Sequence, residues 1–115
     1  MKYMLMIYAS EAQENAMTSA DTQALMQAYT AYTEALASSG ALLAGERLRP
    51  AASATTVRLK GGKTEVLNGP YAETREQLGG YYVIDVPDLD AALSWAARCP
   101  SASMGTIEVR PVWEM

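Results

Sequence analysis

Two short segments of this chain are apolar on both alternating sets of a β-strand, and they restrict the possible folds more than any other feature. The first is Lys2–Tyr8, which reads KYMLMIY, and the second is Gly80–Val86, which reads GYYVIDV. A strand with one solvated face alternates polar and apolar residues, whereas a strand covered on both faces is apolar almost throughout. Something must therefore cover each face of the sheet that contains these segments.

Two helices are predicted from apolar residues at helical spacing. The first spans Asp21 to Leu36, with Thr18 placed to cap its start and Gly40 to stop it; its apolar residues are Leu25, Tyr29, Tyr32 and Leu36. Asp88 can cap a second helix, and Pro100 limits its extension. The residues expected to share the apolar face of this second helix are Leu89, Ala92, Leu93 and Ala96.

Three further segments read as β-structure. Ala41–Leu48 is a strand in which Gly45 marks either a bulge or a close backbone approach. Ala54–Gly69 contains two β-type runs around Gly61-Gly62, a pair that permits the positive φ angles of a tight hairpin. Thr106–Trp113 alternates as a closing strand.

The order of elements is therefore strand, helix, strand, hairpin, strand, helix, strand. Without the hairpin it matches the split βαβ pattern, so the predicted fold is α+β, a ferredoxin-like sheet with an inserted β-hairpin in one domain over residues 1–115. If both helices cover one face of the sheet, the other face needs a partner. The chain has no spare length to cover it, so we expect a homodimer through the open sheet face.

The segment Asn68–Val86, NGPYAETREQLGGYYVIDV, combines a turn, several charges and a double glycine. Asn68 and Gly69 suit a sharp turn that releases the chain from the hairpin. Ala72–Leu78 then reads as a short helical turn that Gly79-Gly80 breaks.

This segment resembles the signature of the DGPF-domain, YCII-related proteins. The fragments MKYMLMIY, GERLRP, ATTVR and IEVRPVWEM are similar to the same family, so the resemblance covers nearly the whole chain. It implies a ferredoxin-like fold of the dimeric α/β-barrel type, and some members are associated with sigma-factor systems. Asn68 and Tyr71 stand where the signature has Asp and Phe, and the His/Asp pair of better-known relatives is missing because the chain has no histidine.

Polar side chains at the expected strand ends form a candidate site; they are Glu46, Arg47, Asn68, Glu73, Arg75, Glu108 and Arg110. As catalytic residues we predict Glu73, a carboxylate that burial could turn into a general base, and Arg110, which would steady an enolate or carboxylate. The predicted ligand-binding residues are Tyr8, Glu46, Asn68 and Glu108. The alternative is that these charges form ion pairs that fix the hairpin or the dimer.

Composition excludes several classes of function. A net charge of −4 offers no basic surface for a nucleic-acid backbone, and no segment has the apolar length of a membrane helix. Cys99 is the only cysteine and histidine is absent, which disfavours zinc or copper; no cofactor is expected. We expect a cytoplasmic protein.

Two functions remain. The first is a homodimer with a small-molecule pocket and cofactor-free proton-transfer chemistry of the lyase or isomerase kind. The second is a non-catalytic regulatory or accessory module that acts through a protein partner in sigma-factor-linked transcription control.

Overall fold

The structure, a computed structural model, describes residues 1–114. Its main elements are β1 (Lys2–Ala9), α1 (Glu11–Asn15), α2 (Ser19–Ser38), β2 (Leu42–Arg47), β3 (Thr55–Lys60), β4 (Lys63–Asn68), β5 (Gln77–Asp85), α3 (Leu89–Arg98) and β6 (Thr106–Pro111). Two short 3₁₀ turns, Ala51–Ser53 and Pro100–Ser103, connect them.

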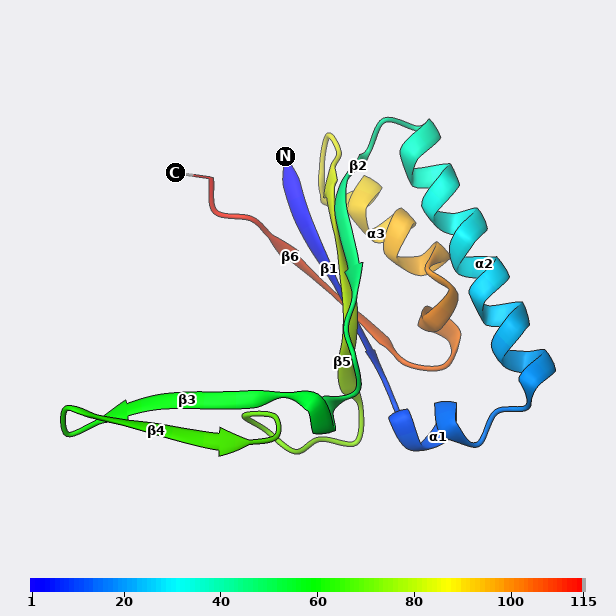
Figure 1. The fold of residues 1–115 in the computed structure, drawn as a ribbon. Helices are drawn as coiled ribbons and strands as arrows, with labels where there is room; N and C mark the ends of the chain where they lie inside the picture. The colour runs from blue at the N-terminus through cyan, green and yellow to red at the C-terminus, as the bar shows by residue number, and fades with distance from the viewer. Residues whose placement is uncertain (115) are drawn as a thin grey trace.

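The main sheet has the strand order β2-β5-β1-β6, and each neighbouring pair is antiparallel. Helices α2 and α3 lie side by side on one face of this sheet, and the opposite face carries no helix (Figure 1). This is the ferredoxin-like arrangement, with β3 and β4 as the inserted hairpin. The predicted fold class is therefore confirmed.

The core lies between the helices and the sheet. Tyr3, Leu5 and Ile7 of β1 are buried under the helices, whereas Met4 and Met6 point to the other face and remain partly exposed. Across this interface the β1 residues pack with buried side chains from the other elements, among them Leu36, Ile84 and Ala92. One chain therefore covers only one of the two apolar sets of β1, the set of Tyr3, Leu5 and Ile7.

Both long helices begin at the predicted caps. The Thr18 hydroxyl accepts a hydrogen bond from the Asp21 amide at 3.1 Å, and the Asp88 carboxylate accepts one from the Ala91 amide at 2.9 Å. Gly40 follows α2 with a φ of 80°, where a residue with a side chain would be strained.

The predicted apolar face of α3 is only half right. Ala92 and Ala96 are buried, but Leu89 and Leu93 remain about half exposed. The small side chains of Ala92 and Ala96 let α3 approach the sheet closely, and the larger Leu89 and Leu93 lie beside this contact line. Trp95 packs against the core from the same helix, so the buried face is rotated from the predicted one.

The predicted helical turn in the signature segment is wrong, and two glycines of the sheet serve close approaches between strands. Ala72–Leu78 forms no helical turn: β5 already begins at Gln77, and Gly79-Gly80 lies inside the strand. A Cβ on Gly80 would come within 2.8 Å of the Glu46 carbonyl oxygen, so this glycine permits the close approach of β2. Gly45 is likewise a close-approach glycine, against the Tyr82 ring, and the bulge of β2 lies between Leu42 and Ala44.

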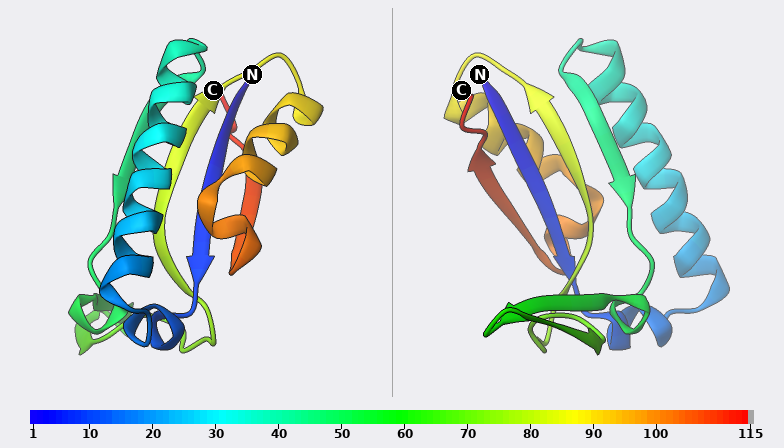
Figure 2. Two further views of the ribbon diagram at one scale, coloured as in Figure 1. Left: turned by 90° about the vertical axis from the view of Figure 1, so that its right-hand side faces the viewer. Right: turned by 60° about the vertical axis from the view of Figure 1, so that its left-hand side comes forward.

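The predicted hairpin is present as a separate two-stranded sheet of β3 and β4, here called the arm (Thr55–Asn68). Gly61 and Gly62 form its turn with φ angles of 58° and 78°. The arm leaves one end of the main sheet and extends away from the helix side, in front of the open sheet face (Figures 1 and 2). No helix within residues 1–114 has both the length and the apolar character to span a membrane.

Candidate functional site

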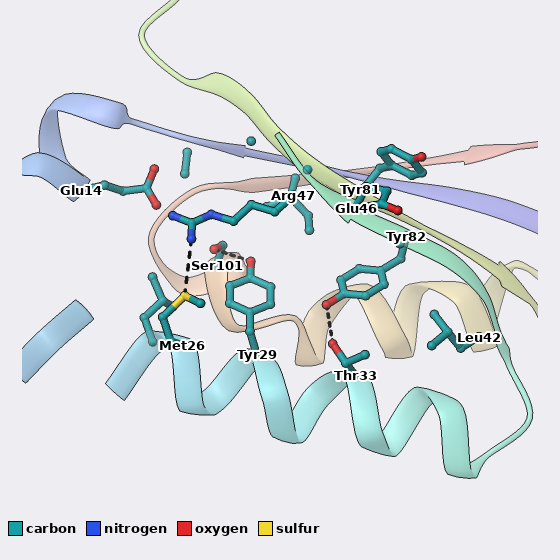
Figure 3. A pocket seen from close by; sticks show the side chains of 16 residues that line it. Glu14, Met26, Tyr29, Thr33, Leu42, Glu46, Arg47, Tyr81, Tyr82 and Ser101 are labelled. Atoms are coloured by element: carbon teal, nitrogen blue, oxygen red, sulfur yellow. Dashed lines mark hydrogen bonds between the residues drawn. The ribbon is translucent and has the colours of Figure 1, made fainter. Parts of the chain in front are cut away.

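A cavity of about 310 Å³ lies between α2 and the helix-side face of the sheet (Figure 3). Strands β2 and β5 form its floor, and α2 forms one wall. The residues around it are Ile7, Ala9, Glu14, Leu25, Met26, Tyr29, Thr33, Leu42, Gly45, Glu46, Arg47, Gly79, Gly80, Tyr81, Tyr82 and Ser101. Most of this lining is apolar or aromatic, with a small set of polar groups, as is usual for small-molecule sites.

Glycines in β2 and β5 give the cavity its shape. Gly45, Gly79 and Gly80 all line it and leave the sheet floor without side chains over a short stretch. Gly45 and Gly80, which allow β2 and β5 to approach one another, therefore also leave part of the space between this floor and α2 unfilled.

Two pairs of hydroxyl groups lie on the α2 side of the cavity. The Tyr29 hydroxyl donates to Ser101 Oγ at 2.5 Å, and the Thr33 and Tyr82 hydroxyls form a hydrogen bond of 2.7 Å. Burial raises the pKa of both tyrosine hydroxyls above their ordinary value. They therefore stay protonated at neutral pH, where they serve as hydrogen-bond donors and not as bases.

Cys99 lies next to this network but does not offer a reactive thiol. It is buried, and its sulfur lies 3.5 Å from the Tyr29 hydroxyl. Burial raises the pKa of the Cys99 thiol, which keeps it in the weakly nucleophilic protonated form.

The charged end of the cavity carries Arg47 and Glu14. The Arg47 guanidinium reaches over Met26, with a nitrogen 3.7 Å from its sulfur, and the Glu14 carboxylate points toward the same space (Figure 3). Among residues 1–114, neither side chain is in an ion pair. A guanidinium and a carboxylate thus face one cavity with donors and acceptors that a ligand can use.

Glu14 is the site residue that sequence reasoning missed. It belongs to α1, a five-residue helix capped by Ser10, whose hydroxyl accepts from the Gln13 amide at 3.2 Å. The available signal was Ser10 with Gln13 three residues later, which is a capping-box spacing. Without that helix there was no reason to bring Glu14 near the sheet.

The structure brings only part of the predicted site together. Glu46 belongs to the strand that borders the cavity, but it is paired with Tyr81, and its side chain points to the open sheet face, away from α2. Glu108 and Arg110 project side by side from the open sheet face, where they form an ion pair with each other. Glu73 is exposed in the segment before β5, and Asn68 is the last residue of the arm. Neither catalytic candidate, Glu73 or Arg110, is among the described residues around the cavity.

Tyr8 lies at a second, more open hollow at the end of the sheet, together with Arg75 and Thr106. Hydrogen bonds occupy most of the polar groups there. The Glu11 amide donates to the Gln77 side-chain oxygen at 2.9 Å, and the Ala51 amide donates to the Glu11 carboxylate at 2.8 Å. These contacts attach α1 to β5 and to the 3₁₀ turn Ala51–Ser53 that precedes the arm, which places Glu14 at the cavity.

A metal site was not expected from the sequence. Within the part of the chain that the structure describes, no group of three or more His, Cys, Asp or Glu side chains is arranged to hold a metal ion.

Comparison with known proteins places this geometry in a family. The model of the YCII-related domain matches residues 1–115. An uncharacterised protein, R00369, from Rhizobium meliloti (strain 1021) is 37% identical over 114 residues, which cover 97% of this chain and 92% of the relative. A solved structure of 5-chloro-2-hydroxyhydroquinone dehydrochlorinase (TftG) from Burkholderia phenoliruptrix AC1100, in complex with 2,5-dihydroxybenzoquinone, has a similar fold. Its TM-score is 0.55 at 15% identity, over 99% of this chain and 94% of that one. The chain therefore belongs to the YCII-related family.

Proposed function

We propose that this protein binds a small oxygenated ring compound in the cavity under α2 and moves a proton on it without a cofactor, as in lyase or isomerase chemistry. The observation that carries the proposal is the arrangement of Arg47 and Glu14 at one end of an otherwise apolar, tyrosine-lined cavity. Apolar walls favour a ring, and the charged end favours an oxygen substituent on it.

The size of the cavity and a protein of similar fold support this ligand class. A volume of about 310 Å³ is at the lower limit of ordinary ligand pockets, which suits a single substituted ring. The dehydrochlorinase of similar fold was solved with 2,5-dihydroxybenzoquinone, a ring compound with four oxygen atoms. A ligand of this kind would find hydroxyl donors along α2 and the guanidinium of Arg47 at its end.

The proposed reaction assigns one role to each charged group. Glu14 takes a proton from a substrate carbon next to an oxygenated position, and Arg47 stabilises the enolate oxygen that forms. The enolate then either takes the proton back at another atom or expels a leaving group from the adjacent carbon. These are the roles that the sequence assigned to Glu73 and Arg110, carried here by the residues that line the cavity.

The first prediction concerns Arg47. Replacing Arg47 by alanine should weaken the binding of hydroxybenzoquinones and hydroxybenzoates about 10- to 100-fold, because a hydrogen bond to a charged group contributes about 1.5–3 kcal/mol. Calorimetric titration of the purified protein with a panel of such compounds measures this loss.

Glu14→Gln keeps the shape of the side chain, so it should retain binding and lose turnover.

Arg49→Ala is the matched control, since Arg49 is exposed and lies outside the cavity. Glu73→Gln and Arg110→Ala test the sequence-based assignment in the same assay. Loss of binding in Arg110→Ala with no change in Arg47→Ala would contradict the cavity assignment. If no compound of the panel binds, the non-catalytic module acting through a protein partner becomes the better explanation.

The open sheet face supports a second part of the proposal, a homodimer. Met4, Met6, Tyr81 and Val83 form an apolar centre on this face and are only partly buried in one chain. A second copy placed sheet to sheet would cover them and give the dimeric α/β-barrel arrangement that the family resemblance implies.

Replacing Met6 by lysine should therefore weaken the dimer at least tenfold, because it places a charge at the centre of an apolar interface. Sedimentation velocity over a concentration series measures the dissociation constant. Leu93→Lys, an equally drastic change on the exposed side of α3, is the control and should leave it unchanged. Equal dissociation constants for the Met6 variant and the wild-type chain would contradict the sheet-to-sheet arrangement.

A further inference from the structure

We propose that the arm, Thr55–Asn68, clasps a second copy of this chain: its apolar face packs on the body of the partner subunit, and the net positive charge of the arm attracts the acidic body. This inference rests on the homodimer proposed above. It extends that proposal from the open sheet face to an element that has no role in a single chain.

One face of the arm is apolar and uncovered. Val57, Leu59 and Val66 are 63%, 72% and 60% exposed. Val57 and Val66 are directly paired across the two strands, and Leu59 is two residues along the same face. An isolated two-stranded hairpin is at best marginally stable in water, so a hairpin of this length needs a surface against which to pack. Within the described chain nothing covers this face.

The direction of the arm identifies the occupant. The arm extends from one end of the sheet on the side of the open face, and the chain after β6 extends on the same side at the other end (Figures 1 and 2). Trp113, in that segment after β6, is 88% exposed. Two apolar projections thus flank the open face at its two ends, and a body seated on this face would contact both.

The reach of the arm matches the thickness of a second copy. Each strand of the arm has 6 residues, which span about 20 Å at about 3.3 Å per residue. Facing sheets pack about 10 Å apart, and a helix layer lies about as far again beyond its sheet. The arm is therefore long enough to pass the sheet of the partner and reach its helices.

The shape of the chain agrees with this role. Its radius of gyration is 16.1 Å, and its extents are 47 × 44 × 18 Å. A compact domain of this length has a radius of gyration of about 13 Å. The arm, which projects away from the end of the sheet in Figure 1, contributes to this excess. If a second copy occupies the space between the arm and the open sheet face, the resulting dimer is more compact than the single chain.

Charge favours a second copy as that partner. The arm carries three basic residues, Arg58, Lys60 and Lys63, and one acid, Glu65, so its net charge is +2. Because the whole chain has a net charge of −4, the rest of the chain has a net charge of −6. The arm of one copy and the body of another are therefore attracted to each other. A partner with only one sign of charge would not be attracted both to the basic arm and to the acidic rest of the chain.

The test changes the apolar face of the arm without changing its strand propensity. The triple variant Val57→Thr, Leu59→Thr, Val66→Thr should raise the dissociation constant of the dimer at least tenfold in sedimentation velocity. A second variant removes Val57–Val66 and joins Thr56 to Leu67, which are cross-strand partners, through two glycines; it should have the same effect. Leu89→Thr with Leu93→Thr, two exposed leucines of α3, is the matched control.

The outcomes separate this inference from the homodimer itself. If Met6→Lys weakens the dimer while both arm variants leave it unchanged, the clasp is wrong and the sheet-to-sheet dimer stands. A wild-type chain that is monomeric at every concentration overturns both. Weakening by both arm variants, with a wild-type dissociation constant that rises with salt, supports the clasp, because the attraction between arm and body is screened by ions.

Discussion

Replacing Leu36 by alanine should lower the free energy of unfolding by about 2–5 kcal/mol, the range for removing a fully buried leucine side chain. Leu36 is 0% exposed and belongs to the core cluster between α2 and the sheet, together with Leu5 and Ile84. The loss combines the transfer free energy of the deleted methyl groups with the cavity that they leave. Urea denaturation followed by circular dichroism, at one fixed protein concentration, measures it.

Leu93→Ala provides the matched control for this change. Leu93 is 47% exposed on α3, so the same deletion removes less buried surface and should cost less than about 1 kcal/mol. Equal losses for the two variants would mean that α2 does not pack on the sheet through Leu36. The cavity beneath α2 depends on that packing, so the ligand assay should be repeated on any variant that remains folded.

Replacing Gly105 by alanine should cost about 1–3 kcal/mol, although it adds only one methyl group. A Cβ at this position would come within 2.1 Å of the Tyr8 carbonyl oxygen and 3.1 Å of the Ala9 Cα. Both are backbone atoms of β1, so no side chain can rotate to make room. The strain acts where β6 begins to pair with β1, next to the Tyr8 and Thr106 register pair.

Gly79→Ala is the control for the Gly105 variant. Its Cβ would meet only the Ile7 carbonyl oxygen, at 3.9 Å, which is an ordinary contact. Its free energy of unfolding should lie within about 0.5 kcal/mol of the wild-type value, the usual range for a substitution that creates no steric conflict. Thermal unfolding of both variants checks the difference; a Gly105 variant as stable as the Gly79 variant would show that the start of β6 can move away from β1.

The candidate site was only partly visible in the sequence, and the reasons differ from residue to residue. Arg47 was recognised because it follows an apolar run at a strand end; Glu46, chosen for the same reason, lies on the opposite face of the sheet. Tyr29 was assigned to the core from its helical spacing, yet its hydroxyl lies at the cavity, because periodicity identifies a buried face and not an unfilled space within it. Glu14 was missed because its helix is too short to give a periodic signal.

The two predicted catalytic residues, Glu73 and Arg110, lie away from the cavity. Glu73 and Arg110 were chosen because both carry charge near the family signature and the last strand. Arg110 lies on the open face, in an ion pair with Glu108, and Glu73 lies in the exposed segment before β5. Charge and position along the chain do not reveal on which side of the sheet a side chain lies when the register of the strand is unknown.

Local patterns in the chain were sufficient for the order of the strands and the two longer helices, the caps at Thr18 and Asp88, the Gly61-Gly62 hairpin and the need to cover two sheet faces. These features depend on the backbone preferences and solvation of residues close in sequence. The cavity, the meeting of Glu14 with Arg47 and the direction of the arm depend on how distant segments pack. Because that packing is set by the register between strands and by close approaches at Gly45, Gly80 and Gly105, only the assembled fold decides where these side chains meet.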